Sequence, residues 1–291
     1  MFPIDEIPAI QSAPEDFRLL RRIPWTKPDV AFPIINVPVE VDNLQAVVWL
    51  DCETTGFQAG HDKIIELGLT KGYVDPITGE LISLVASVSF YEDPGFPLPE
   101  IITQITGITD EMVSGRTIDG VQVREWFTDD PIVVAHNASF DRPFFESRFP
   151  MLDQLRWACS MKDIPWQEYG FESTKLEYLL YRLGYFYEGH RASIDAIATA
   201  FLMSQVPRAS RALLEAEAAS NVRIDAIGSP FHVKDTLKFH GFQWDGDNRV
   251  WHTEVRETAL DSILAFLTQT YDFGGDRAHV TRLTSRDRYK G

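Results

Sequence analysis

Two acidic residues at the end of an apolar run are the first feature of this sequence that suggests chemistry. Residues 46–50 are all apolar and are followed by Asp51 and Glu53. The run is typical of a strand buried on both faces, and residues two apart in a strand point to the same side. Both carboxylates therefore face one pocket. Because like charges at the end of a core strand repel, a hard divalent ion with oxygen ligands is the usual way to neutralise them.

A strand that runs into a solvated acidic turn is the simpler interpretation of a lone Asp-x-Glu pair, but residues downstream argue against it. Asp141 lies in the first turn of a predicted helix directly after the apolar strand 132–135, so it can face a crevice at the strand ends. The helix dipole alone also favours an acid there. His190 and Asp195 lie five apart, the first in a predicted loop and the second in a predicted helix. Taken alone, that last pair carries no weight.

Taken together, the three segments resemble the exonuclease motifs of the DEDDh 3′–5′ exonucleases. The first is Asp-Cys-Glu-Thr-Thr-Gly at 51–56, and the second is His-Asn-Ala-Ser-Phe-Asp at 136–141. His190 followed by Asp195 is the third, so all five family positions are present in order and spacing. The similarity is to the bacterial DNA polymerase III proofreading (epsilon) subunit branch of this ribonuclease H-like superfamily.

This resemblance implies a fold, a metal site and a general base. The fold would be α/β, with a mixed five-stranded sheet (three strands antiparallel, two parallel) and helices on both faces. Asp51, Glu53 and Asp195 would ligate one Mg2+ or Mn2+ ion, and Asp141 would hold a second ion largely through water. Two such ions suit in-line displacement at phosphorus. His190 would be the general base, since an unperturbed histidine titrates near working pH.

Six further residues would contact or support the terminal nucleotide, again by resemblance. They are Thr54, Gly56, Phe57, Ile108, Asn137 and Phe140. The first three follow the acidic strand, and the fourth lies in a Gly-Ile-Thr loop of the kind that relatives have at this place. The last two come from the second motif and would support Asp141 rather than act directly.

The length of 291 residues favours one large and one small domain. The predicted parts are a proline-rich N-terminal arm (1–43), the exonuclease domain (44–206), a connecting helix or linker (207–221) and a small C-terminal α/β module of unknown role (222–291). In the arm we expect a helix over 14–22. Extended backbone fixed by prolines follows it, and the arm lies across a domain surface through Phe17, Leu20, Trp25 and Phe32.

Hydrophobic periodicity and turn residues predict the elements that position these residues. In the large domain we expect strands at 45–51, 64–74, 81–91, 132–135 and 155–159, and helices at 99–105, 119–127, 174–183 and 192–205. In the small module we expect a strand at 222–227, a helix at 231–239, a hairpin at 241–255, a helix at 257–270 and a strand at 279–284. The Asp-Gly and Asp-Asn turn chemistry at 245–248 indicates the hairpin most clearly.

Charge and cysteine usage narrow the classes of function. The 43 acidic and 27 basic residues give a net charge of −16. This balance argues against a protein that holds nucleic acid by counterion release alone, although metal ions can supply positive charge at an enzyme site. The two cysteines form no disulfide framework and no zinc pattern. With no secretory signal and no apolar run of membrane-spanning length, we expect a cytoplasmic protein with no membrane partner.

The resulting hypothesis is a metal-dependent 3′–5′ exonuclease that releases nucleoside 5′-monophosphates from single-stranded or frayed DNA. Its partner would be a nucleic acid 3′ end, with a polymerase or another replication or repair protein as a further partner. Two alternatives stay open. The first is an exoribonuclease that trims short RNA, because the five site residues do not distinguish the sugar. The second is a non-catalytic scaffold or binding protein on an exonuclease fold, which is disfavoured because none of the five residues is missing.

Overall fold

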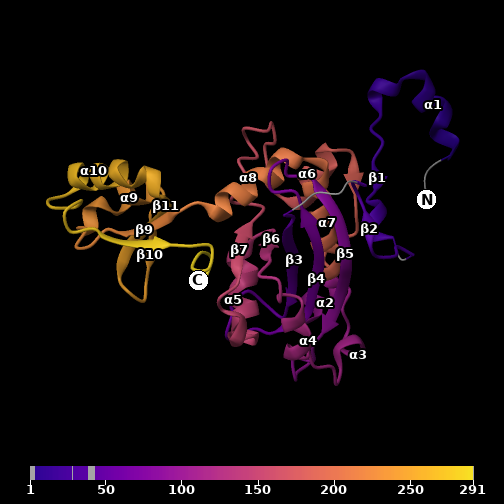
Figure 1. Cartoon of the computed structure of the whole chain (residues 1–291), viewed down its shortest axis with the longest axis horizontal. Coiled ribbons are helices and arrows are strands. Elements are labelled where there is room, and N and C mark those ends of the chain that lie inside the picture. The colour runs from indigo at the N-terminus through magenta and orange to yellow at the C-terminus, as the bar shows by residue number, and fades with distance from the viewer. Residues whose placement is uncertain (1–3, 28, 39–42, 291) are drawn as a thin grey trace. The chain divides into compact units, whose positions relative to one another are not determined.

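The structure, a computed structural model, describes most of the chain (Figure 1) and leaves out residues 1–3, 28, 39–42 and 291. The first three of these segments belong to the predicted arm and the last to the predicted module, so those parts of both predictions lie outside the described residues. The chain divides into two compact units, Met1–Ala216 with Tyr289–Gly291, and Glu217–Arg288. Among the described helices, none combines the length and the apolar character needed to cross a bilayer.

The first unit is built on a mixed six-stranded sheet with the order β2-β5-β4-β3-β6-β7. β3, β4 and β5 pair antiparallel, whereas β6 pairs with β3 and β7 pairs with β6 in parallel. The strands are β2 (Ile34–Ile35), β3 (Gln45–Thr54), β4 (Ile64–Val74), β5 (Leu81–Tyr91), β6 (Ile132–Ala135) and β7 (Arg156–Cys159). This confirms the predicted mixed α/β fold. The predicted sheet lacked β2, which comes from the arm and lies at the sheet edge, where neighbouring prolines are tolerated.

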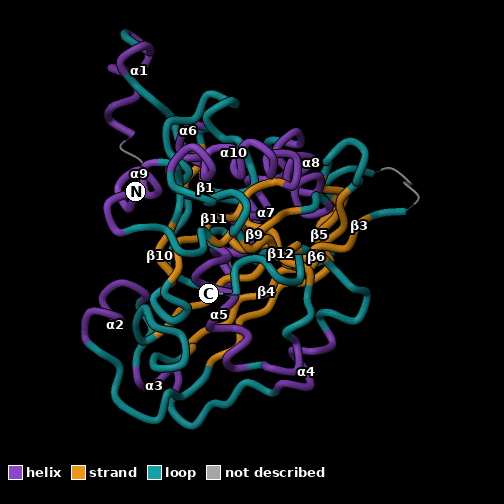
Figure 2. The backbone as a smooth tube through the Cα atoms, turned by 90° about the vertical axis from the view of Figure 1, so that its left-hand side faces the viewer, coloured by secondary structure: helices purple, strands orange, loops and turns teal. Residues whose placement is uncertain are grey.

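Helices cover both faces of this sheet. The helices of the unit are α1 (Ile7–Ser12), α2 (Glu100–Thr106), α3 (Asp110–Val113), α4 (Gly120–Glu125), α5 (Ala138–Arg148), α6 (Leu176–Arg182), α7 (Ala192–Gln205) and α8 (Pro207–Ala218), whose end continues into the second unit. Figures 1 and 2 both place α2, α3 and α4 at one end of the unit and α8 at the opposite end. The short helix α3 was not predicted, since the residues around position 110 are typical of a loop.

β3 separates two hydrophobic cores because its side chains alternate. Val47 and Trp49 pack in a buried cluster with residues of α6 and α7, and Val48 and Leu50 pack in another with residues of α5. Cys52 continues the row that faces α5. By the same alternation, Asp51 and Glu53 continue the row that faces α7. The acids of the first motif are thus aimed at the helix that carries the third.

The arm does not form the helix predicted over 14–22. Only Pro14–Asp16 makes a single 3-10 turn, and Arg21–Arg22 form β1, which pairs in parallel with β8 (Tyr185–Phe186). The prediction was wrong because pairing with a strand more than 160 residues away replaces local helical hydrogen bonds, which is a tertiary effect that propensity does not contain.

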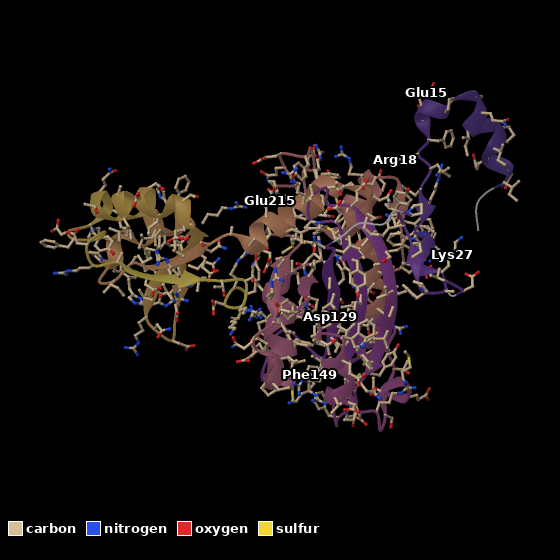
Figure 3. All side chains as sticks on the ribbon, in the orientation of Figure 1. Glu15, Arg18, Lys27, Asp129, Phe149 and Glu215 are labelled. Atoms are coloured by element: carbon tan, nitrogen blue, oxygen red, sulfur yellow. The ribbon has the colours of Figure 1, made fainter. Side chains whose placement is uncertain are left out.

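The arm nevertheless packs on the first unit, as its aromatic residues led us to expect. The ring of Trp25 meets Phe201 of α7 edge-on, with ring centroids 5.0 Å apart. Arg18, labelled in Figure 3, donates hydrogen bonds to the backbone carbonyls of Tyr181 and Arg182, at 3.1 and 2.9 Å. Phe32 is partly buried against the same core, whereas Phe17, which was also expected to make this contact, is exposed.

The second unit has the element order β-α-β-β-α-β and one antiparallel sheet, ordered β10-β11-β9-β12. Its elements are β9 (Asn221–Asp225), α9 (Lys234–Phe239), β10 (Gln243–Asp245), β11 (Val250–Arg256), α10 (Leu260–Thr270) and β12 (His279–Leu283). The predicted hairpin is confirmed: β10 pairs with β11, and the Asp245 carboxylate accepts hydrogen bonds from the N–H groups of Asp247 and Asn248 in the turn.

Gly68 of β4 is a position at which α7 approaches the sheet closely. A Cβ atom there would overlap the backbone of Ala192 and Ser193, at the start of α7. We therefore expect Gly68→Ala to displace this end of the helix and to lower the free energy of unfolding by about 1–3 kcal/mol, the usual cost of overpacking. Urea unfolding measures this change.

Gly120→Ala is the matched control, because the nearest atom to a new Cβ there is 3.8 Å away. We expect this control to be neutral or slightly stabilising, since alanine favours a helix. Equal stabilities of the two variants would contradict the close packing of α7 on β4.

Candidate active site

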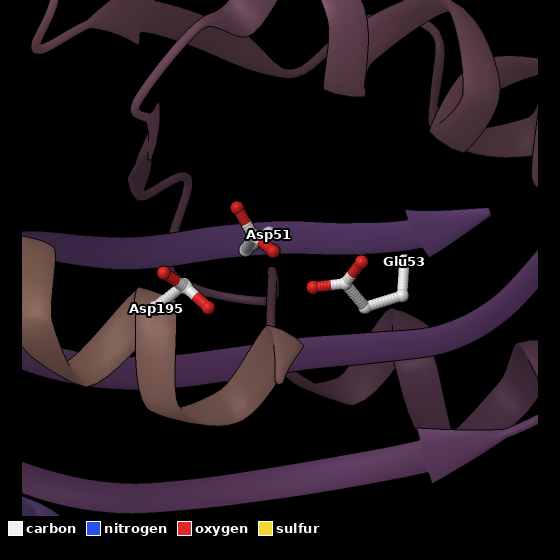
Figure 4. Close-up of side chains that lie close together, drawn as sticks. All are labelled: Asp51, Glu53 and Asp195. Carbon is white, nitrogen blue, oxygen red and sulfur yellow. The ribbon is translucent and has the colours of Figure 1, made fainter. Parts of the chain in front are cut away.

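Three of the predicted acids come together at one point in the first unit. Carboxylate oxygens of Asp51, Glu53 and Asp195 all lie within 4.8 Å of one another. Figure 4 shows the two side chains from β3 and the one from α7 pointing toward one another. Within the described part of the chain, this is the single group of three or more acidic, histidine or cysteine side chains with ligand atoms so close.

Asp195 is held by hydrogen bonds to both of its oxygens. The Tyr187 hydroxyl donates to Oδ1 at 2.9 Å, and the backbone N–H of Arg191 donates to Oδ2 at 3.1 Å. Burial and the neighbouring Asp195 charge raise the pKa of Tyr187, so its hydroxyl keeps its proton and remains a donor. The sequence analysis missed Tyr187, although a tyrosine three residues before the motif histidine was a usable signal.

Asp141 approaches the same strand from the other face of the sheet. It lies in the first turn of α5, is only 3% exposed, and accepts a hydrogen bond at Oδ1 from the backbone N–H of Cys52 at 3.1 Å. Its carboxylate is not part of the close group of three. The helix α5 therefore brings the fourth acid next to β3 without bringing it into the cluster.

Burial and mutual repulsion make these acids difficult to ionise in the absence of a cation. Burial, and next the neighbouring Asp141, Asp195 and Glu53, raise the pKa of Asp51 well above its usual range. Burial, and next the neighbouring Asp195, Glu66 and Asp141, raise the pKa of Glu53 to about 8, and burial raises that of Asp141 to about 7. The pKa of Asp195 is also raised by burial. A group of oxygen donors in this state fits a hard divalent cation such as Mg2+ or Mn2+.

His190 lies beside the acids but is not fixed among them. It is exposed, in the loop between β8 and α7, and its backbone has a φ of 63°. This left-handed conformation is uncommon for residues other than glycine, although histidine is enriched there. Across the described residues, the His190 ring makes no hydrogen bond. Its charged form interacts with Asp195 and works to lower the pKa of that carboxyl group.

The six residues predicted to line the nucleotide fall into two groups. Phe57 is 87% exposed, and its ring meets Phe140 edge-on with centroids 6.4 Å apart. The Thr54 hydroxyl donates to the carbonyl of Gly56 at 2.6 Å and so stabilises the turn that precedes Phe57. Asn137 precedes α5 with a φ of 128°.

Ile108 differs from the other five. Its side chain is fully buried in a small cluster with Ile65, Leu98 and Val113. In this conformation it offers no surface to a nucleotide. The loop position alone suggested a contact, because sequence cannot tell which side of a loop turns inward.

His136 is a structural histidine in the second motif. Burial lowers its pKa to about 4. The neutral ring donates from Nε2 to the carbonyl of Thr174 at 2.7 Å, so Nδ1 accepts from the Ser160 hydroxyl at 2.8 Å. These bonds tie the loop after β6 to two later segments and hold the start of α5, where Asp141 lies.

The region that contains all five residues matches a known family. A profile of the exonuclease family RNase_T matches residues 48–203, more than half of the chain. The chain belongs to the RNase_T exonuclease family. The match begins inside β3 and ends inside α7. It therefore covers most of β3, all of β4 to β7, the carboxylate group and the His190 loop of this exonuclease family member.

Curated relatives of this exonuclease family member are much longer proteins. It is 34% identical over 204 residues to the PolC-type DNA polymerase III of Listeria innocua, and 36% identical over 176 residues to that of Clostridium perfringens. These matches cover 65% and 58% of the chain but 13% and 12% of the relatives.

Two solved structures were also found to be similar. One is Exonuclease X in complex with 5′ overhanging duplex DNA, at a TM-score of 0.43 and 23% identity, with 58% of this chain and 98% of that one covered. The other is a full-length 3′-exonuclease, at a TM-score of 0.45 and 16% identity, with 58% of this chain and 62% of that one covered.

The raised pKa of Glu53 predicts how stability depends on pH without metal. An unfolded glutamate titrates at about 4.3, whereas Glu53 in the folded chain titrates at about 8. Between these values the folded state keeps a proton that the unfolded state has lost, so stability decreases as the pH rises. We expect Glu53→Gln to flatten this decrease in the metal-free protein.

Thermal unfolding of both proteins, with a chelator present, measures this difference across that pH window. Added Mg2+ should raise the melting temperature of the wild type most at the upper end of the window, because the ion replaces the missing positive charge. Parallel pH profiles for the two proteins would contradict the electrostatic description of the site.

Proposed function

We propose that this chain is a divalent-metal-dependent 3′–5′ exonuclease that releases nucleoside 5′-monophosphates from single-stranded or frayed DNA. The observation that carries the proposal is the group of three half-buried carboxylates, Asp51, Glu53 and Asp195, inside the region that matches the exonuclease family. A scaffold role is less well supported, since a scaffold has no need of clustered acids that resist ionisation.

Each site residue has a part in the proposed hydrolysis. Asp51, Glu53 and Asp195 would hold the Mg2+ or Mn2+ ions, and Asp141 would help to hold the second ion. Bound ions of this kind activate water and offset the charge that develops on the phosphate. His190 accepts the proton of the attacking water at a ring nitrogen. Its exposed loop position suits a group that meets substrate and water together.

The bond changes determine the product. A bond forms between the water oxygen and phosphorus, and the bond from phosphorus to the 3′-oxygen of the preceding nucleotide breaks. The released nucleotide keeps its 5′-phosphate, and the shortened strand regains a 3′-hydroxyl. Phe140 meets the ring of Phe57 edge-on and would have no direct part in the reaction, whereas Phe57, because its ring is widely exposed, would stack on the terminal base. Thr54, Gly56 and Asn137 would shape the lip around it.

DNA is the preferred substrate in this proposal, with RNA as the alternative. The curated relatives are named DNA polymerases, which supports DNA and also a polymerase or another replication protein as a partner. Both cysteines are free and buried, which supports a reducing compartment such as the cytoplasm.

A direct assay tests the proposed reaction. With Mg2+ or Mn2+ present, the purified chain should shorten a 5′-labelled single-stranded DNA oligonucleotide stepwise from its 3′ end. A 3′-phosphate should block this, and a chelator should abolish it. Asp51→Asn should leave almost no activity, because it removes a charged ligand of the ions.

Asp129→Asn is the matched control for the lost charge, since Asp129 is exposed and pairs with Lys71 on the surface. We expect this control to retain full activity. Degradation that starts at the 5′ end, or an Asp51→Asn variant that keeps substantial activity at saturating Mn2+, would contradict the proposal. A matched RNA oligonucleotide that is degraded faster than DNA would select the ribonuclease alternative.

The general base gives a second prediction. His190→Ala should lower kcat by roughly 10²–10⁴-fold, the usual contribution of a positioned proton acceptor. The affinity for Mn2+ should change little, because the histidine is not a proposed ligand. The acid limb of the pH–rate profile should also disappear. If that limb persists in His190→Ala, another group accepts the proton.

A further inference from the structure

Glu66 is a buried acid that the proposed chemistry does not use. Its side chain is fully buried in β4, directly across from Glu53 in the register of β3 and β4. The Glu66 charge is among the causes that raise the pKa values of both Asp51 and Glu53. An additional buried negative charge beside this cluster lowers the stability of the fold unless a partner compensates it, so the partners of Glu66 indicate its role.

The partners of Glu66 come mainly from the turn that follows His190. Arg191 donates to the Glu66 carboxylate from Nε at 3.0 Å and from its second guanidinium nitrogen at 3.5 Å. The backbone N–H of Ala192 donates to Oε2 at 3.2 Å, and the Ser89 hydroxyl donates to Oε1. Every one of these contacts is a donor to Glu66, so both of its carboxylate oxygens act as acceptors.

Tyr91 also binds the side chain of Arg191. It lies across from Glu66 in the register of β4 and β5, its hydroxyl is hydrogen-bonded to the guanidinium, and its ring centroid is 5.6 Å from the guanidinium carbon. The row Glu53, Glu66 and Tyr91 thus crosses three neighbouring strands. The proposed metal ligand Glu53 and the two residues that bind Arg191, Glu66 and Tyr91, therefore lie on the same sheet.

These contacts fix the backbone on the C-terminal side of His190. The residue before α7 is Arg191, and it provides no side-chain cap for the helix. Glu66 supplies the missing acceptor by binding the N–H of Ala192, where a negative charge is also favoured by the helix dipole. Since His190 immediately precedes Arg191 and Asp195 lies one turn further, one carboxylate controls the position of both.

We propose that Glu66, through Arg191, is a positioning residue that holds the His190 loop and the start of α7 in register with the acids of β3. This inference rests on the proposed exonuclease function for its catalytic consequence. Glu66 itself touches neither substrate nor ion in this role. A small displacement of the histidine or of Asp195 is enough to slow the reaction.

Glu66→Gln is the first test, because it keeps the shape but removes the charge and one of two acceptor atoms. We expect kcat to fall about 10- to 100-fold, with KM nearly unchanged. The Mn2+ dissociation constant should rise less than kcat falls, because Asp195 keeps its own hydrogen bonds to Tyr187 and Arg191. Hydrogen exchange at the amide of Ala192 should become faster, which is a readout independent of activity. In a His190→Ala background, Glu66→Gln should have a much smaller effect on kcat, since the group being positioned is already absent.

Glu92→Gln is the matched control. Glu92 accepts two hydrogen bonds from Nε of Arg148, at 2.9 and 2.8 Å, in another partly buried pair of the same unit. We expect a similar loss of stability with kcat and Ala192 exchange unchanged. If Glu66→Gln does not fold, Arg191→Ala is the alternative test, because the arginine side chain is partly exposed. This variant should reproduce the loss of kcat and the faster exchange at Ala192.

Three results would count against this role. A large loss of Mn2+ affinity with normal kcat at saturating metal would make Glu66 a ligand. Equal effects of Glu66→Gln and Glu92→Gln on stability, with kcat unchanged in both, would make the pair structural only. Full additivity with His190→Ala would show that the histidine is not what Glu66 positions. A wild-type chain that cleaves no nucleic acid would overturn the proposed function alone, and the exchange rates would still decide whether Glu66 anchors this turn.

Discussion

Repulsion between carboxylates at the end of β3 is the constraint on which the rest of this structure depends. Asp51, Glu53 and Asp195 would separate if their backbones were free to move, because burial and proximity both disfavour their charged forms. They are held together by the packing around them. β3 is buried between two cores, and α7 begins directly against β4 at Gly68. The fold is therefore arranged to keep in place a group that is unfavourable without a cation.

The hydrogen bonds that hold the carboxylate cluster in place lie mostly at the start of α7. β3 needs little help, since β4 pairs with it from Gln45 to Thr54 and β6 pairs with it over Val47–Trp49. The start of α7 is a helix end with unpaired N–H groups, and such ends fray unless capped. Tyr187, the backbone of Arg191 and the carboxylate of Glu66 all bind there. The same turn carries the exposed His190, so the proposed catalytic base and the proposed metal ligand Asp195 lie within six residues of each other.

Local patterns in the sequence were sufficient to predict the central strands and to identify the clustered acids. The strands at 64–74 and 81–91 were predicted with their observed bounds, because long apolar or alternating runs between turn residues strongly favour strands. The alternation of β3 also placed Asp51 and Glu53 on one side. The arm was not predictable in this way, since β1 depends on β8. Tyr187 and Glu66 were missed for a related reason: their roles come from cross-strand register and from a distant loop, although an acid within the run Ile64-Ile65-Glu66-Leu67 was a signal.

Calorimetric titration of Mn2+ into the metal-free chain near neutral pH, in two buffers of different ionisation enthalpy, tests the central claim most directly. The acids hold protons there without metal, since Glu53 and Asp141 titrate at about 8 and about 7. Metal binding to ionised ligands must release such protons. We predict saturable binding with net proton release, and the loss of both when Asp195 is replaced by asparagine. Binding without proton release, or binding that survives Asp195→Asn unchanged, would contradict the assignment of these carboxylates as the metal site.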